Sequence, residues 1–213
     1  MTPTFALSVS NALPPELLAS RIESVRSLSE SIPSLRSICV RDDAMEPMLL
    51  SLAAVLAEGT GLRVILESAD PLRLAAGAGS LDSQALLLSP EGDQEVLYEV
   101  ASATGSAVAV SSARPQLFQE LIGKAEDAGC PDIVLHPIAP SMKGCLESTV
   151  HARRVSDLPV MSRAWSGEYA LAVSSVSFMR GGSLAVLDDL DPQACAVLDS
   201  VARNLSGPGF ETT

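Results

Sequence analysis

Polar residues that follow short apolar runs are the best placed for chemistry in this sequence. His136 comes directly after Asp-Ile-Val-Leu, Arg41 and Asp42 follow Ser-Ile-Cys-Val, and Asn11 lies two residues beyond Phe-Ala-Leu-Ser-Val. A histidine in this position could be a ligand, a general base or a hydrogen-bond donor, or it could only satisfy nearby backbone groups. The neighbouring amide, carboxylate and guanidinium groups could hydrogen-bond a polar ligand, but they do not define a reaction.

Nine residues that directly follow the apolar runs, or lie in the loops after them, form the candidate ligand-binding set. They are Asn11, Arg41, Asp42, Ser89, Ser112, His136, Arg163, Trp165 and Asp188. A wider set of polar residues at such positions adds Glu67, Ser68, Ser111, Ser162 and Asp189. Trp165, the only tryptophan, could stack on a flat ligand or simply cover the rim of the fold. None of these residues is identified as catalytic.

Other motifs mainly exclude classes of site. Asp188-Asp189-x-Asp191 could bind a divalent cation, but an acid directly before Pro192 is typical of a helix N-cap, and we favour that interpretation. Two histidines cannot build a three-histidine zinc site, so no metal site is predicted. Glycine-rich phosphate loops and G-x-S-x-G are absent. Neither lysine, Lys124 or Lys143, lies in an apolar run, which argues against a Schiff-base aldolase.

The apolar runs themselves predict the fold. They recur roughly every 22 to 32 residues, and a helix-like stretch follows each one. The runs are Phe5–Val9, Ser37–Arg41, Arg63–Leu66, Ala85–Leu88, Ala107–Ser111, Asp132–His136, Leu158–Met161 and Leu184–Leu187. Continuous apolar strands alternating with helices are typical of a parallel sheet buried on both faces, and eight such units are what a closed barrel needs. We therefore predict an α/β fold, a single-domain (β/α)8 TIM barrel over residues 1–205, followed by a flexible tail over 206–213.

In such a barrel the C-terminal ends of the strands form the functional face, which would gather the candidate residues in one place. Helices are expected at Pro14–Leu28, Glu46–Glu58, Pro71–Ala78, Gln94–Thr104, Cys145–Val155, Glu168–Met179 and Pro192–Asn204, with one more between Pro115 and Gly129. Asp42 and Asp43 are expected to cap the second helix and Asp70 the third. His151 is expected on a solvated helix surface.

Composition limits the partners. The formal net charge is −12 and the 14 Lys and Arg residues are scattered, so neither nucleic acid nor an anionic membrane surface is expected as a partner. The sequence shows neither a signal peptide nor an apolar stretch long enough to span a membrane. None of the four cysteines forms a C-x-x-C pair. A cytoplasmic protein with reduced cysteines is expected.

Four stretches, in one order, resemble a known family. They are FALSVSNALPPELLASRIESVRSL, ICVRDDAMEPMLLSLAAVLAEGTGLRVILESADPLRLAAGA, DAGCPDIVLHPIAPSMKGCLESTVHARR and FMRGGSLAVLDDLDPQACAVLDSVARN. Together they resemble the barrel domain of the corrinoid iron–sulfur protein large subunit, in the gamma/delta subunit family of acetyl-CoA decarbonylase/synthase. The family has Asp-Pro-Gly where this sequence has His136-Pro137-Ile138. The cysteine cluster of the family's iron–sulfur module and its corrinoid domain have no counterpart here.

The resemblance implies a barrel subunit or remnant of a corrinoid methyl-transfer system in one-carbon metabolism. Such a chain would act as a scaffold or binding module and would not be catalytic on its own. It would bind no cofactor alone, and a corrinoid would come through a corrinoid-binding or methyltransferase partner. The alternative is a pterin-dependent methyltransferase-like enzyme that binds methyltetrahydrofolate at the strand C-termini, where Asn11, Asp42 and Asp188 would serve.

Overall fold

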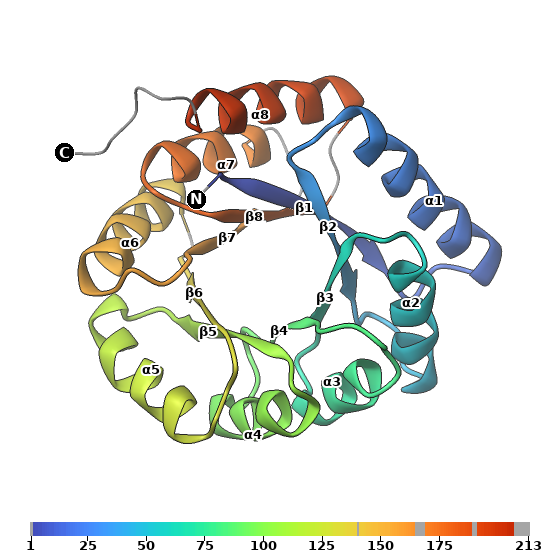
Figure 1. Ribbon diagram of the computed structural model, residues 1–213, viewed down its shortest axis with the longest axis horizontal. Coiled ribbons are helices and arrows are strands. Elements are labelled where there is room, and N and C mark those ends of the chain that lie inside the picture. Colours follow the sequence, from blue (N-terminus) through green and yellow to red (C-terminus); the bar gives the residue numbers. More distant parts are fainter. Residues whose placement is uncertain (1, 140, 165–168, 189–190, 207–213) are drawn as a thin grey trace.

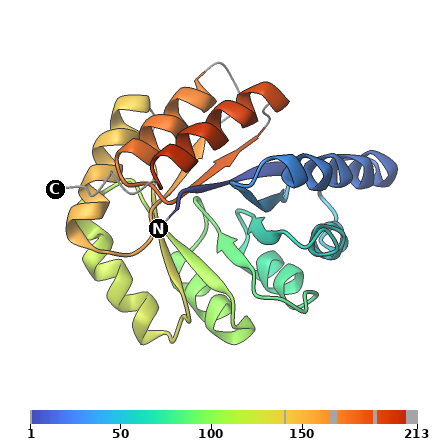
Figure 2. The same ribbon diagram turned by 45° about the horizontal axis from the view of Figure 1, so that its top comes forward.

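Eight parallel strands alternate with helices along the chain and surround a central axis, with the helices forming an outer layer (Figures 1 and 2). The computed structural model describes residues 2–139, 141–164, 169–188 and 191–206. The strands are β1 (Thr4–Ser10), β2 (Leu35–Arg41), β3 (Arg63–Glu67), β4 (Leu86–Leu88), β5 (Ala107–Ser112), β6 (Ile133–Pro137), β7 (Met161–Ala164) and β8 (Leu184–Leu187). The helices are α1 (Pro15–Ser31), α2 (Met48–Glu58), α3 (Pro71–Ala78), α4 (Gln94–Thr104), α5 (Phe118–Asp127), α6 (Met142–Val155), α7 (Ala170–Met179) and α8 (Pro192–Asn204). A short 3-10 helix, Pro115–Leu117, leads into α5. The predicted single-domain (β/α)8 barrel is confirmed.

The strand ladder runs in the order β6-β5-β4-β3-β2-β1-β8-β7. Its two ends meet at the weakest join, where a single isolated bridge connects Leu135 of β6 to Val160, directly before β7. The amide of Leu135 also donates to the carbonyl of Pro159 at 2.8 Å. Pro137 and Pro159 carry no N–H, so neither can donate a ladder bond at this join.

Two separate cores follow from the alternation of side chains along each strand. The larger core packs between the strands and the helices and contains most of the buried Leu, Ile and Val. The smaller core fills the inside of the barrel with Ala6, Cys39, Ile65, Leu88, Ala109, Met161 and Val186. The inner core is therefore aliphatic, as the low aromatic content requires, and polar side chains begin above it at the C-terminal mouth.

Strand β7 corrects one sequence prediction. The apolar run Leu158–Met161 predicted the strand, but the ladder with β8 pairs Met161 with Leu184 and continues to Ala164. The run is the approach to the strand, because Pro159 cannot donate to a ladder. As a result Arg163 lies inside the strand, where it is 7% exposed, and not in a loop behind it.

Helix starts also differ in detail. Asp70 caps α3 and Asp191 caps α8, as expected. In contrast, α2 begins at Met48 behind Pro47 with no side-chain cap, so the predicted capping role of Asp42 and Asp43 is wrong. Helix α6 begins at Met142, earlier than predicted, because Ser141 accepts the amide of Gly144.

The predicted tail falls largely outside the described residues, as does Trp165.

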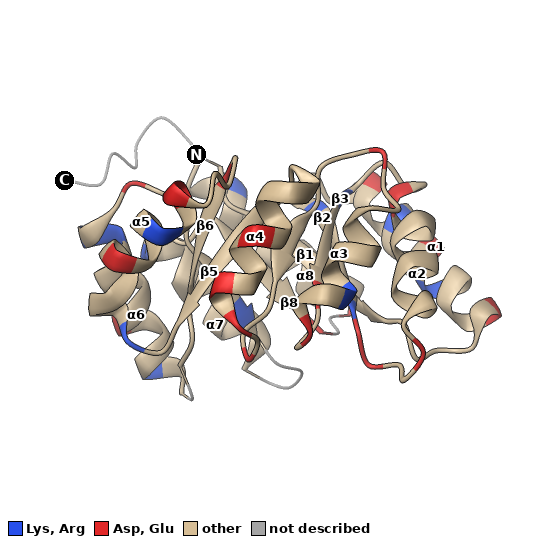
Figure 3. Ribbon diagram, turned by 90° about the horizontal axis from the view of Figure 1, so that it is seen from below, with Lys and Arg blue, Asp and Glu red and all other residues tan. Residues whose placement is uncertain are grey.

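Acidic residues are spread over helices and loops at both ends of the barrel (Figure 3). Among the described helices, none is both long and apolar enough to cross a membrane. Cys39 and Cys195 are buried, and Cys130 and Cys145 are partly buried. His151 is exposed, as predicted.

Candidate functional site

A row of charged residues, buried at Glu67 and Arg163 and partly exposed at Arg41 and Asp43, lies across the C-terminal mouth of the barrel. Arg163 of β7 places Nε 3.1 Å from Oε2 of Glu67 on β3, and one of its terminal nitrogens donates to Asp188 at the end of β8. Asp188 also accepts from Arg41 of β2 at 2.8 Å, and Arg41 reaches Asp43 at 2.7 Å. Acidic and basic residues alternate along this row, so each of these charged side chains lies beside one of opposite charge.

These contacts set the charge of the buried groups. Burial by itself lowers the pKa of Arg163, but the adjacent Glu67 outweighs it and the pKa is raised, so Arg163 stays charged. Cys39 lies beneath, with Sγ 3.6 Å from Oε2 of Glu67. Burial, and then the negative charge of Glu67, raise the pKa of Cys39 well above its usual range. Cys39 is therefore a protonated thiol and not a nucleophile.

A second polar network lies at the ends of β1, β2 and β3. The side-chain amide of Asn11 donates to Asp42 at 2.8 Å, and its oxygen accepts the backbone amides of Asp43 and Ala44, each at 2.8 Å. Asp42 also accepts from Ser68 and Arg73, both at 2.7 Å. The network satisfies the carboxylate of Asp42 and fixes the loop that leads to α2.

His136 of β6 pairs with Ser111 of the neighbouring strand β5. The Ser111 hydroxyl lies 3.0 Å from His136 Nδ1, and both residues are buried. Burial, and then the positive charge of Arg163, lower the pKa of His136 to about 4. The ring is therefore neutral at pH 7, and its Nε2 has no hydrogen-bond partner among the described residues.

A cavity of about 300 Å³ opens beside His136 and Arg163, at the join of β6 and β7. Its other walls are largely apolar and include Ile138, Met142 and Val173. The cavity thus combines one charged donor, one neutral imidazole and apolar surface, which is the usual make-up of a small-molecule pocket.

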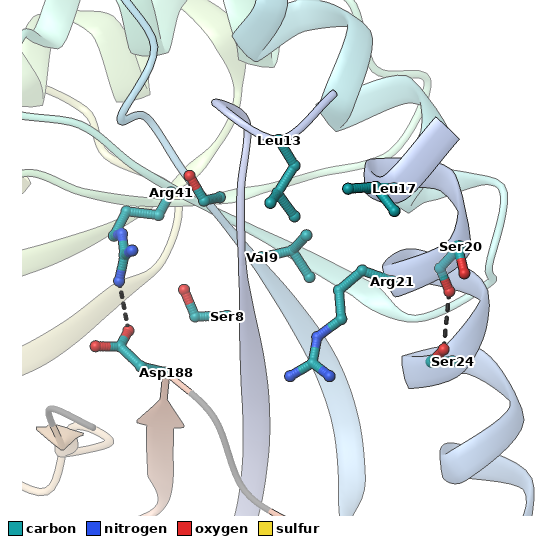
Figure 4. Close-up of a pocket in the computed structure, with 10 residues that line it drawn as sticks. Ser8, Val9, Leu13, Leu17, Ser20, Arg21, Ser24, Arg41 and Asp188 are labelled. Atoms are coloured by element: carbon teal, nitrogen blue, oxygen red, sulfur yellow. Dashed lines mark hydrogen bonds and ion pairs between the residues drawn. The ribbon is translucent and has the colours of Figure 1, made fainter. Parts of the chain in front are cut away.

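A second hollow, of about 570 Å³, lies between β1 and α1 on the other side of Asp188 (Figure 4). Ser8 faces the pair formed by Arg41 and Asp188 in this view, and Arg21 of α1 lies on the opposite wall. The Ser8 hydroxyl is buried with no hydrogen-bond partner in the described part of the chain. The two hollows are separated by the charged chain of Arg163, Asp188 and Arg41.

The predicted site residues fall into three groups. Arg41, Arg163 and Asp188 form one connected chain, with His136 in the same cavity wall as Arg163, and Asn11 joins Asp42. Ser89 and Ser112 stay apart from both networks: the Ser112 hydroxyl bonds to the backbone of Arg114, and that of Ser89 has no partner among described residues. Trp165 lies outside the described residues.

Glu67, Ser111 and Arg73 belong to the site but not to the nine selected residues. Glu67 and Ser111 stand at the ends of predicted strands, and that position was their only sequence signal. Arg73 gave none, because it lies in a helix and meets Asp42 across 31 residues of chain.

Metal binding has no support in the described part of the chain. No group of three or more His, Cys, Asp and Glu side chains there could hold a metal ion. Asp191, the last acid of the Asp188-Asp189-x-Asp191 stretch, accepts the amides of Gln193 and Ala194 as a helix cap. Asp189 lies outside the described residues.

Comparison with known proteins shows that the fold is similar to that of several solved structures. No family model matches the sequence, and no curated protein matches it. Among solved structures, dihydropteroate synthase from Thermus thermophilus is similar, with a TM-score of 0.76 at 14% identity over 95% of this chain and 94% of that chain. The same enzyme in complex with 6HMPPP gives the same TM-score, identity and coverage. The 7,8-dihydropteroate synthase from Vibrio fischeri has a TM-score of 0.73 at 9% identity, over 98% of this chain and 95% of that one. The chain thus has the fold of these enzymes over nearly its whole length.

Proposed function

We propose that this chain is a pterin-binding barrel protein that holds the ring of a reduced folate at the C-terminal mouth, in the cavity beside His136 and Arg163. The observation that carries the proposal is the likeness, over 95% of the chain, to dihydropteroate synthases, a family of pterin-binding barrels. The resemblance to a corrinoid methyl-carrier barrel points to the same area of one-carbon chemistry. Methyltetrahydrofolate is the reduced folate that fits both likenesses.

The chemistry of the cavity suits a pterin. The ring is flat, and its edges carry N–H donors beside carbonyl and ring-nitrogen acceptors. A guanidinium donates to such acceptors. Arg163 supplies that donor in the cavity wall, where Glu67 holds it at 3.1 Å, and Ile138 and Val173 offer apolar surface to the ring faces.

The neutral imidazole of His136 adds a third contact. When the Ser111 hydroxyl donates to Nδ1, the ring proton is on Nε2, which then donates to an acceptor on the ligand. The low pKa keeps His136 from competing as a second positive charge beside Arg163. Ser111 is therefore a positioning residue, which sets the tautomer of His136.

Catalysis is not assigned to the chain alone. Within the described residues, both carboxylates that approach Arg163, those of Glu67 and Asp188, are engaged by guanidinium groups. A general acid or base needs a proton that it can exchange with the reacting group, and neither carboxylate is available for that. Methyl transfer would therefore depend on a partner protein that supplies the group to which the methyl is transferred.

Calorimetric titration with methyltetrahydrofolate tests the proposal, with the fluorescence of Trp165 as a second readout. Saturable binding is expected, and Val173→Phe, which narrows the cavity without touching an ion pair, should weaken it at least tenfold. Val197→Phe on the exposed surface of α8 is the matched control and should bind like the native chain. Folded native protein that shows no binding at high ligand concentration would end the proposal.

A partner that carries a corrinoid is the second candidate function, and an apolar rim around the mouth favours it. The apolar rim consists of Leu17, Met45, Leu72, Met142 and Tyr169, which are 44–88% exposed. Four of them lie within or next to the first turns of α1, α3, α6 and α7, and Met45 lies in the loop before α2. Exposed apolar side chains gathered around a site are typical of a protein interaction surface.

Sedimentation with a purified corrinoid protein, followed at the visible absorbance of the corrinoid, tests this second candidate. Co-sedimentation is expected, and Leu72→Glu combined with Tyr169→Glu should abolish it. Met179→Glu, at the opposite end of α7, should leave it unchanged because Met179 is comparably exposed but far from the rim. Separate sedimentation of the two native proteins would reject the partner.

A further inference from the structure

Helix α2 has an outward face made almost entirely of apolar side chains. Met48 is 83% exposed, Leu52 46%, Val55 47% and Leu56 38%. The opposite side of the helix is fully buried against the barrel through Leu50, Ala53, Ala54 and Ala57. We call Met48, Leu52, Val55 and Leu56 the α2 face. Because the helix already buries one complete apolar side, this second side is not needed for the fold.

The spacing within the α2 face is that of a helix–helix seam. Met48, Leu52 and Val55 follow one another at intervals of four and three residues. This is the spacing of the apolar positions through which two helices pack side by side. The occupant that fits such a seam is another helix.

The distribution of charged residues indicates which helix could pack on the α2 face. The chain has a net charge of −12, so two copies repel one another over most of their surface. Within α2 the only charged residue is Glu58, at its last position. By comparison, charged residues are more numerous on α5, which carries Glu120, Lys124, Glu126 and Asp127, and on α6, which carries Lys143, Glu147, Arg153 and Arg154. The α2 face is thus a surface where two copies can meet with little like-charge contact.

The exposed apolar area of the α2 face also favours a contact between two copies. The α2 face exposes roughly 400 Å² of apolar surface, which is within the range of the largest patch on a typical monomer. Two such faces together with their polar edges reach the order of 1,000 Å² that a specific interface needs. A hollow of about 380 Å³ runs between α1 and α2, with Leu56 and Ile22 on its walls and the Glu23–Arg26 ion pair at its edge. Such a hollow can receive side chains of a facing helix.

We propose that the α2 face is a dimer interface and that its occupant is α2 of a second copy of this chain, related by a two-fold axis near Leu52 and Val55. A two-fold contact uses the same patch on both copies, so a second copy always supplies a matching uncharged seam. This proposal is independent of pterin binding.

Sedimentation equilibrium of the native chain and of Leu52→Glu tests the dimer. The native chain should be dimeric at high micromolar concentration, and Leu52→Glu should weaken dimerisation by roughly thirtyfold or more, as expected for a central interface side chain. Val197→Glu, a similarly exposed position on α8, should remain dimeric. Circular dichroism checks that each variant is folded.

A cross-linking pair keeps the test decisive if Leu52→Glu does not fold. Leu52→Cys should form a disulfide-linked dimer on mild oxidation, whereas Val197→Cys should not. A native chain that stays monomeric, a dimer that survives Leu52→Glu, or equal cross-linking at both positions would each overturn the proposal.

Discussion

Arg163 and Glu67 tie opposite sides of the barrel together, with Arg163 Nε 3.1 Å from Glu67 Oε2. Their strands, β7 and β3, are not neighbours in the sheet, and each residue is 7% exposed. The mutual attraction of a buried ion pair roughly offsets its desolvation, so the pair adds little net stability, but removing one partner is costly. The pair is therefore a sensitive point of the mouth.

Replacing Arg163 with Met should lower the free energy of unfolding by about 3–5 kcal/mol, because Glu67 is then left as a buried charge without its partner. Urea denaturation measures the loss. The control is Arg26→Met, which breaks the exposed pairs with Glu23 and Glu30 and should change stability little. Equal losses in both variants would show that the buried pair carries no special weight.

The contrast between the barrel and its mouth shows how far sequence reasoning extends. The strands were predictable because each one is a local apolar run between turn residues, and periodicity within a short window is enough to find it. Arg163 and Glu67 are 96 residues apart, and no local pattern indicates that they meet. The same reason explains Asp42: from the sequence alone it is a candidate helix cap, but Asn11, Ser68 and Arg73 bind its carboxylate from distant segments.

His136 should make stability depend on pH between about 4 and 6.5. Its folded pKa of about 4 lies below its ordinary value of 6.5, so in this window the unfolded chain binds a proton that the folded chain does not. Stability is therefore fully present above pH 6.5 and decreases as the pH falls toward 4. The shift corresponds to about 3 kcal/mol.

Urea denaturation at several pH values, for the native chain and for His136→Gln, measures this contribution. The variant should lose less stability than the native chain between pH 6.5 and 4, since the paired carboxylates are common to both. His151→Gln, which removes the exposed histidine, is the matched control. Identical pH dependence in the native chain and His136→Gln would contradict the burial of a neutral imidazole.

Asn11 should be needed to fix the loop before α2. Replacing it with Leu removes the acceptor for the amides of Asp43 and Ala44, and leaving a buried donor unsatisfied costs about 1–3 kcal/mol. Amide hydrogen exchange should become faster at Asp43 and Ala44 and stay unchanged in α5. Asn204→Leu, at the exposed end of α8, provides the control. Unchanged exchange in the loop would mean that Asn11 does not hold it.

Gly92 and Gly123 offer a matched test of how tightly the mouth loops pack. A Cβ at Gly92 would collide with Ser89 Oγ and lie 2.7 Å from the carbonyl oxygen of Ala69, whereas a Cβ at Gly123 would meet nothing within 4 Å. Gly92→Ala must therefore push apart the loops after β3 and β4, and we expect a loss of about 1–3 kcal/mol. Gly123→Ala, inside α5, should instead stabilise the protein by about 0.5–1 kcal/mol.

The same pair of variants also tests ligand binding. Because Pro90, in the same loop as Gly92, lines the cavity beside His136, only Gly92→Ala should also weaken methyltetrahydrofolate binding. Thermal denaturation and calorimetry of the two variants measure both effects, and a neutral Gly92→Ala would show that these loops are free to separate.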